Sequence, residues 1–206
     1  MIECIYADDQ LVVVNKPAGL LSVPGRGPDK QDCLWHRVQQ QYPTARIVHR
    51  LDQATSGLMV LALNADSHRA LSIQFQERIP EKRYQAVVQG EPVQNEGEVD
   101  LPLRCDWERR PRQMVDFEQG KPALTRWRCI ERLGDRSRML LFPHTGRSHQ
   151  LRVHMLAMGH PILGDEFYAP PAALELTPRL LLHAEHLGFK HPASHDWLSF
   201  DSVCSF

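Results

Sequence analysis

Apolar residues along the chain fall into short runs separated by polar turns, a pattern that predicts several β-strands. The runs 2–6 and 11–14 flank a polar Asp-Asp-Gln sequence and are expected to form a hairpin. Strands are also expected over segments rich in apolar, β-branched or aromatic residues: 58–62, 84–88, 124–133 and 138–142.

Fewer segments have the spacing of an amphipathic helix. Asp32 is placed to cap a helix whose apolar face lies within 34–42, and 65–78 also shows helical spacing. A third helix is expected over 148–158, ending before Gly159. Closely spaced strands with few helices between them favour an α+β fold on a mixed, mostly antiparallel sheet flanked by helices.

Length and composition fit one compact domain. A chain of 206 residues with 42% hydrophobic content can build one sizeable core, so we expect a single domain over 1–206. The apolar runs are far shorter than a bilayer span and the first residues lack the order of a signal peptide, so we expect a cytoplasmic protein away from membranes. The sequence has no glycine fingerprint for a dinucleotide.

Metal binding is not expected. The five cysteines include no C-x-x-C pair, which argues against both a disulfide framework and a zinc site. Histidines 144, 149, 154 and 160 are five or six positions apart, so they would not stack on one helical face.

The formal net charge of −1 gives the whole protein no field that attracts a nucleic acid. Any nucleic-acid binding must therefore use local basic patches, and segments 78–83 and 104–112 are basic. The second combines an exposed-looking tryptophan with four arginines, which suits base stacking and phosphate contacts: Trp107, Arg104, Arg109, Arg110 and Arg112. The alternative is a solvated loop of mixed charge.

The segment 49–57 carries the strongest chemical signal. The sequence His-Arg-Leu-Asp places three kinds of charged or polar group before the apolar run 58–62. The small residues beside it, Thr55, Ser56 and Gly57, are expected to leave room for a ligand. This suits an active-site loop delivered onto a buried strand. The alternative is a solvated ion pair at a strand entrance, which would contribute little.

Together with segments 15–25 and 143–154, this loop resembles the RluA family of RNA pseudouridine synthases. The resemblance rests on His-Arg-Leu-Asp-x-x-Thr-Ser-Gly at 49–57 and Gly-Arg-x-His-Gln-x-Arg at 146–152. The sequences at 82–84, 159–165 and 180–184 follow in the family's order, so nearly the whole chain is covered. The resemblance implies the family's catalytic domain, with a central active-site cleft.

The resemblance also implies the reaction and its residues. Uridine is isomerised to pseudouridine with Asp52 as the essential carboxylate, and Arg147 is expected to pair with Asp52 and keep it ionised. Tyr84 is expected to stack on the target uracil, although a tyrosine packed at a strand start is the alternative. Arg50 is a candidate to fill the space of a flipped-out base, and a surface ion pair is its alternative. Leu151 is expected in the wall of the uracil pocket, or else in the helix core.

No cofactor is expected, because the reaction is a redox-neutral isomerisation. An N-terminal S4 domain, which many relatives carry, is not expected here. The chain most resembles the short, dual-specificity members, which implies uridines of a tRNA anticodon loop and a 23S rRNA hairpin. A monomer is expected. Alternatives are one different RNA target, a catalytically silent RNA-binding module, or a glycoside hydrolase or nucleosidase with Asp165 or Glu166 as second acid.

Overall fold

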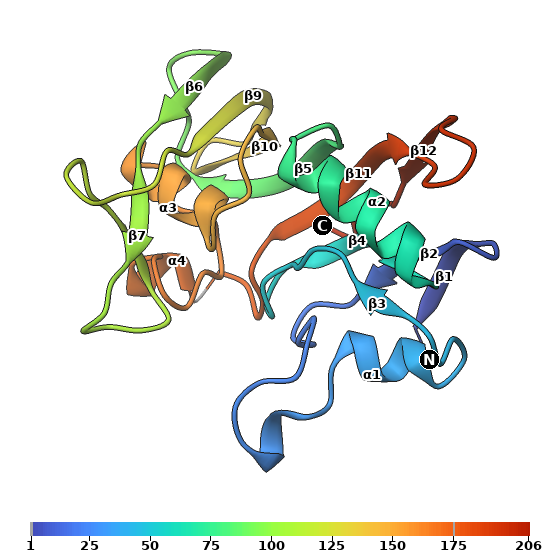
Figure 1. The fold of residues 1–206 in the computed structure, drawn as a ribbon. Helices are drawn as coiled ribbons and strands as arrows, with labels where there is room; N and C mark the ends of the chain where they lie inside the picture. Colours follow the sequence, from blue (N-terminus) through green and yellow to red (C-terminus); the bar gives the residue numbers. More distant parts are fainter. Residues whose placement is uncertain (1, 175) are drawn as a thin grey trace. The chain divides into compact units, whose positions relative to one another are not determined.

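The computed structural model describes residues 2–174 and 176–206, and these divide into two compact units (Figure 1). The first unit spans Met1–Lys82 and His183–Ser205, and the second spans Arg83–Leu182 with Phe206. Each unit contains strands, helices and buried apolar clusters. The single domain expected from the sequence stays a prediction.

The strands of the first unit run in the order β1-β2-β4-β11, with β3 paired to β4 and β12 paired to β11. The pairing of β4 with β11 is parallel, and the others are antiparallel. The predicted hairpin is confirmed as β1 and β2. The bounds are β1 (Glu3–Ala7), β2 (Leu11–Lys16), β3 (Arg46–Ile47), β4 (Ser56–Ala62), β11 (Leu182–Lys190) and β12 (Trp197–Asp201).

The helices of the first unit are η1 (Pro28–Lys30), α1 (Leu34–Gln39) and α2 (Ala65–Gln76). Asn64 caps α2 by accepting a hydrogen bond from the backbone N–H of Ser67 at 2.8 Å. The predicted cap of α1 is wrong, because Cys33 occupies that position and its side chain forms no capping bond. Asp32 instead forms a two-pronged ion pair with Arg37, at 2.6 and 2.7 Å.

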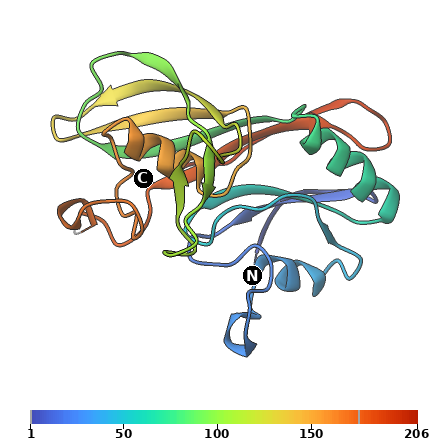
Figure 2. The same cartoon turned by 60° about the vertical axis from the view of Figure 1, so that its left-hand side comes forward.

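Side chains of β2 and β4 are buried on both faces of the sheet. On one face a cluster that includes Val13 and Val60 packs with Leu71 of α2. Successive strand residues point to opposite faces, so the fully buried Val12 and Leu61 lie on the other face, the side on which α1 runs (Figure 2). The strand β4 is therefore covered on both sides, as expected for the apolar run 58–62.

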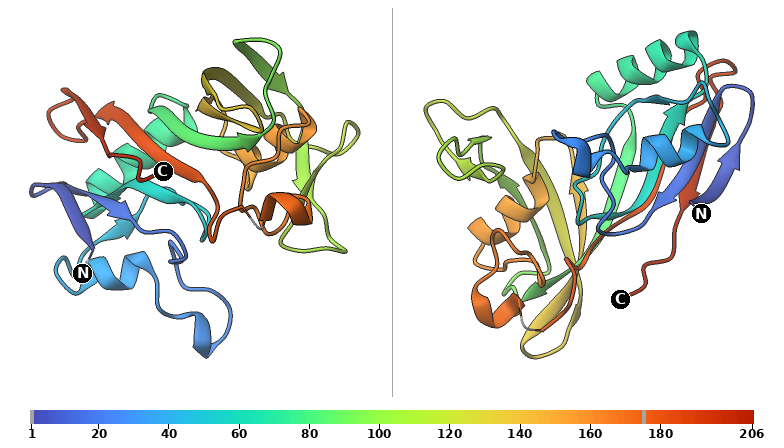
Figure 3. Two further views of the ribbon diagram at one scale, coloured as in Figure 1. Left: turned by 180° about the vertical axis from the view of Figure 1, so that it is seen from behind. Right: turned by 90° about the horizontal axis from the view of Figure 1, so that it is seen from below.

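The sheet of the second unit has the order β5-β10-β9-β6, with antiparallel pairs throughout. A separate hairpin is formed by β7 (Leu103–Cys105) and β8 (Gln113–Val115). The helix α3 packs against one face of the sheet (Figure 3). The remaining bounds are β5 (Glu81–Gln89), β6 (Glu96–Asp100), β9 (Leu124–Arg132), β10 (Arg136–Pro143), α3 (Gln150–Ala157) and α4 (Pro171–Leu174).

The helix α3 is shorter than the range expected from the sequence. It begins at Gln150 rather than at residue 148, because His149 has a left-handed backbone with φ of 53° and serves as its N-cap. It ends before Gly159, whose φ is 83°, as expected. The observed strands and helices confirm the predicted α+β class with a mixed, mostly antiparallel sheet.

Candidate active site

The loop that carries Asp52 is held by its backbone immediately before β4. Ser22 donates from Oγ to the carbonyl oxygen of Leu51 at 2.6 Å and accepts from the Leu51 N–H at 3.1 Å. The N–H of Thr55 donates to the carbonyl oxygen of Asp52 at 3.1 Å, which closes the turn. Asp52 itself is half-buried. Its carboxylate therefore projects from a backbone that is fixed on both sides.

A buried lysine ties the segment 16–20 to the same loop. The ammonium of Lys16 is fully buried and donates hydrogen bonds to three carbonyl oxygens, those of Pro17 at 2.9 Å, Leu20 at 2.8 Å and Gln53 at 3.1 Å. Gln53 also accepts from the N–H of Gly19 at 2.8 Å. No role was expected for Lys16 from the sequence. The signal was a cation two positions after the apolar run 11–14, at the end of a buried strand, where a charge needs partners.

The small residues after Asp52 have a structural reason. Gly57 has a φ of 120° and lies so close to the backbone of Ala184 that any Cβ would collide with its carbonyl oxygen. The Oγ of Ser56 lies 2.9 Å from Nδ1 of His183, within hydrogen-bond distance. Room for a ligand was the reason expected from the sequence, whereas at Gly57 the observed reason is close packing of β4 on β11.

His49 fixes the other end of the loop in a neutral form. Its Nε2 accepts a hydrogen bond from the N–H of Val60 at 3.2 Å, and its ring stacks on Phe75 with centroids 4.4 Å apart. Burial, together with the positive charge of Lys82, lowers the pKa of His49 to about 3. Burial and the charge of Arg78 lower the pKa of Lys82 to about 8. His49 is therefore an uncharged acceptor at neutral pH.

Arg50 is the exposed member of the same loop. Within residues 2–174 and 176–206 it forms no ion pair or side-chain hydrogen bond. The alternative of a surface ion pair with a neighbouring acid is therefore not observed in the described part of the chain. The guanidinium is available to a ligand.

In the second unit, Tyr84 and Leu151 occupy a strand and a helix. Tyr84 is half-buried on β5, in register with Leu141 of β10. Leu151 is buried near the start of α3, with 7% of its surface exposed. Both positions are compatible with the roles expected from the sequence and with the structural alternatives.

Arg147 lies in the turn before α3, and Gln150 organises that turn. The Oε1 of Gln150 accepts from the N–H of Arg147 at 3.0 Å and from the hydroxyl of Thr145 at 2.7 Å. Its Nε2 donates to the carbonyl oxygen of Leu124 and to Oγ1 of Thr125, both at 3.0 Å. Arg147 Nε donates to a carbonyl oxygen of the segment before β9, that of Pro122, at 3.2 Å. Gln150 was part of the recognised motif, but this role was not foreseen.

The expected catalytic residues come from both units. Asp52 belongs to the first unit, whereas Tyr84 and Arg147 belong to the second. An ion pair between Asp52 and Arg147 stays a prediction.

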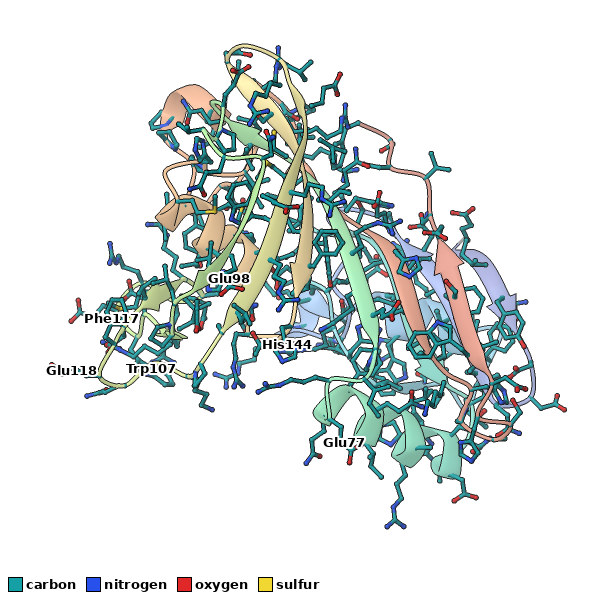
Figure 4. The ribbon with its side chains drawn as sticks, turned by 90° about the horizontal axis from the view of Figure 1, so that it is seen from above. Glu77, Glu98, Trp107, Phe117, Glu118 and His144 are labelled. Atoms are coloured by element: carbon teal, nitrogen blue, oxygen red, sulfur yellow. The ribbon has the colours of Figure 1, made fainter. Side chains whose placement is uncertain are left out.

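The arginine-rich segment forms the tip of the β7–β8 hairpin. Trp107 is 63% exposed, and the guanidinium carbon of Arg110 lies 4.3 Å from the centroid of its ring. Figure 4 labels Trp107 in this tip and Phe117, which is also exposed, in the segment that follows β8. Two of the expected RNA-binding arginines are already paired, Arg104 with Asp116 and Arg109 with Asp106, whereas Arg110 and Arg112 have no ion pair among the described residues.

Within residues 2–174 and 176–206, no group of three or more His, Cys, Asp or Glu side chains is placed to hold a metal ion. Among the helices of the same residues, none is long and apolar enough to span a bilayer.

The sequence model of the RNA pseudouridylate synthase family matches residues 10–157. Since this match covers well over half of the chain, the protein belongs to that family and is an RNA pseudouridine synthase. The resemblance inferred from the sequence motifs is confirmed.

The chain is also similar to individual proteins of this family. The chain is 53% identical to the dual-specificity RNA pseudouridine synthase RluA of Pasteurella multocida, over 100% of this chain and 94% of the relative. It is 55% identical to the protein of the same name from Escherichia coli K12, over 98% and 93%. The solved structure of human RNA pseudouridylate synthase domain containing 1 is similar with a TM-score of 0.82 at 29% identity, covering 98% of this chain and 83% of that one.

Proposed function

We propose that this synthase isomerises one uridine in the anticodon loop of certain tRNAs and one in a hairpin of 23S rRNA, with Asp52 as its essential carboxylate. The proposal of two RNA classes rests on the dual specificity named for relatives that share more than half of their residues with this chain. The observation that carries the assignment of Asp52 is its loop, which Ser22 and Lys16 hold rigid while the carboxylate stays half-buried.

The reaction breaks the bond from C1′ of the ribose to N1 of uracil and forms a bond from C1′ to C5. The proton on C5 is lost and N1 gains one, so no electrons or groups enter from outside. A carboxylate can form an ester-like adduct, stabilise positive character on the sugar or remove a proton, and it can leave again afterwards. Each role requires an ionised Asp52, and the cation proposed to keep it ionised is Arg147.

Tyr84 is proposed to stack on the target uracil from β5. An aromatic face suits this task because base stacking is worth about 1–3 kcal/mol per base. General-base work by its hydroxyl would need activation, since a tyrosine ordinarily has a pKa near 10. Stacking is therefore the role assigned here. Leu151 is proposed to supply an apolar wall of the same pocket.

A base stacked in an RNA loop must leave the stack to reach Asp52, at a cost of a few kcal/mol. Arg50 is proposed to occupy the space that the base vacates. Its planar guanidinium can stack and donate hydrogen bonds, and its exposure without an ion pair in the described chain leaves it available.

The β7–β8 hairpin is proposed to bind the RNA outside the target nucleotide. Trp107 offers an exposed ring for stacking, and Arg110 and Arg112 offer cations for phosphates. Arg104 and Arg109 are expected to contribute less, because each already neutralises an aspartate. Their main task is to shape the hairpin. We further propose that the enzyme acts as a monomer in the cytoplasm, where these RNAs are found.

The test is pseudouridine mapping on unmodified tRNA and 23S rRNA fragments incubated with wild-type protein or Asp52→Asn. We expect new pseudouridine in both RNAs with wild type alone, while Asp52→Asn binds each RNA within a few-fold of wild type. Signal in only one RNA would contradict dual specificity. No signal at stoichiometric enzyme, with RNA still bound, would contradict the proposed activity on these substrates.

A further inference from the structure

The hydroxyl of Tyr168 connects two parts of the second unit that the proposed function uses for different purposes. It accepts a hydrogen bond from the backbone N–H of Gln113 at 2.8 Å, and it lies 2.7 Å from Nδ1 of His149. Gln113 is the first residue of β8, directly after the arginine-rich tip. His149 is two residues after Arg147 and caps α3.

The ring that carries this hydroxyl is firmly held. Tyr168 is 9% exposed, and its backbone N–H donates to Oδ1 of Asp165 at 3.3 Å. Asp165 forms a fully buried ion pair with Arg152, with N···O distances of 2.6 and 2.7 Å. The guanidinium carbon of Arg152 lies 5.2 Å from the ring centroids of both Tyr168 and Phe167. The Tyr168 hydroxyl is therefore a fixed point to which the hairpin is attached.

The hairpin is held differently at its two ends. At its base, Leu103 packs in an apolar cluster with Val153 of α3 and with the Tyr168 ring. The backbone of Leu103 also pairs with Lys121 through two hydrogen bonds, at 2.8 and 2.9 Å, so the base is fixed and the tip extends from it. The bond from the Gln113 N–H to the Tyr168 hydroxyl is directional and lies on the tip side.

His149 makes the other half of the connection. Its left-handed backbone, with φ of 53°, is uncommon for a residue other than glycine and must be held by its surroundings. The imidazole is stacked beside Phe167, with centroids 5.7 Å apart, and meets Tyr168 edge-on. The same aromatic pair thus fixes the residue that shapes the turn of Arg147.

We propose that Tyr168 is a positioning residue that keeps the RNA-binding tip of the β7–β8 hairpin in register with the turn that carries Arg147. This inference rests on the proposed function, because it takes the tip around Trp107 as an RNA contact. RNA held by the tip then presents its target uridine in a defined orientation, and the affinity for RNA depends on a hydroxyl that does not touch it.

The test compares steady-state kinetics of wild type, Tyr168→Phe, Trp107→Ala and the double variant on one RNA substrate, below the unfolding temperature of each protein. Loss of one hydrogen bond that orients the tip is expected to weaken RNA affinity about tenfold, which corresponds to about 1.4 kcal/mol of binding free energy. Tyr168→Phe is expected to raise KM about tenfold and to change kcat less than twofold. Tyr6→Phe is the matched control, since it also removes one hydrogen-bonded hydroxyl, here 2.7 Å from Asp8 in the first unit, and it should leave both constants unchanged.

Two further readouts separate positioning from a general loss of structure. If Tyr168 acts through the tip, the double variant should have a KM less than twofold above that of Trp107→Ala alone. Hydrogen exchange of the Gln113 amide should accelerate in Tyr168→Phe, while the paired amides of β9 and β10 keep their protection. Additive effects on KM would overturn the inference.

The kinetics distinguish a failure of the inference about Tyr168 from a failure of the proposed role of the hairpin. If Trp107→Ala raises KM and Tyr168→Phe does not, the inference is overturned and the proposed role of the hairpin stands. If Trp107→Ala leaves KM unchanged, the hairpin does not bind RNA, and both the role of the hairpin and the inference are overturned. Pseudouridine formation by wild type would still support the proposed activity.

Discussion

The ammonium of Lys16 donates a hydrogen bond to the carbonyl oxygen of Gln53 across 3.1 Å, although 37 positions separate them in the chain. Gln53 directly follows Asp52, so the end of β2 holds the loop of the proposed catalytic carboxylate. The ammonium is fully buried and its charge is satisfied by three carbonyl oxygens. Such an arrangement is stable only while all of its members are present.

Lys16→Met is expected to lower the free energy of unfolding by about 2–4 kcal/mol, because the carbonyl oxygens of Pro17 and Leu20 lose the ammonium as their donor. It is also expected to lower kcat on RNA at least tenfold, because the loop of Asp52 loses its support. Urea unfolding and single-turnover kinetics measure the two effects. Lys190→Met, at an exposed position of the same unit, should change neither quantity. Equal behaviour of the two variants would show that the buried ammonium does not hold the loop.

The low pKa of His49 in the folded protein predicts how stability depends on pH. Its pKa is about 3 in the folded protein and about 6.5 in an unfolded chain, so between these values the unfolded state binds more protons. Stability must therefore fall as pH is lowered from about 6.5 towards 3, by up to about 1.4 kcal/mol per pH unit from this group. His49→Gln keeps an acceptor for the Val60 N–H but cannot titrate. Urea midpoints at pH 7.5, 6 and 5 should fall less steeply in the variant, and parallel profiles would contradict this account.

Gly57 allows a test of close packing between β4 and β11. Gly57→Ala is expected to destabilise the protein by more than about 3 kcal/mol, because the φ of 120° is unfavourable and the new Cβ meets the backbone of Ala184. Gly134→Ala is the control, since Gly134 also has a positive φ, of 86°, but nothing lies within 4 Å of an added Cβ. Thermal unfolding should show a clearly larger loss at Gly57. Equal losses would mean that backbone strain alone accounts for the effect.

The local pattern of the sequence predicted six strands, because a buried strand such as β4 is readable as an uninterrupted apolar run. It did not predict the strands β3, β6, β7, β8, β11 and β12. It failed at helix starts. Asp32 is drawn away from the cap of α1 by its ion pair with Arg37, and His149 adopts a left-handed backbone, so α3 begins two residues later than expected. Both depend on side-chain contacts that a hydrophobic pattern does not report.

The parts of the site that sequence did not reveal are long-range contacts. Ser56 and His183 are 127 positions apart, and nothing in either segment indicates that Oγ and Nδ1 lie within 2.9 Å. The exposure of Trp107 was expected from its charged neighbours and is confirmed. The pairing of Arg104 with Asp116 was not expected, because Asp116 directly follows β8 and lies outside the basic segment 104–112.

This difference among the hairpin arginines gives a quantitative prediction for RNA binding. Each phosphate that a cation neutralises contributes about 0.7–0.9 to the slope of log K against log salt concentration. Arg110 lies over Trp107 and forms no ion pair within the described residues, so Arg110→Gln should lower that slope by nearly one. Arg109 is paired with Asp106 at 2.8 Å, so Arg109→Gln should lower it by less than half as much.

The comparison is measured by titrating one RNA substrate with each protein at several salt concentrations. The two variants remove the same charge from adjacent positions, so they change the net charge of the protein equally. A long-range field would therefore change both slopes alike, whereas direct phosphate contact at one position separates them. Equal slopes for the two variants would assign RNA attraction to the general charge of the tip, and an unchanged slope in both would remove the tip from the RNA interface.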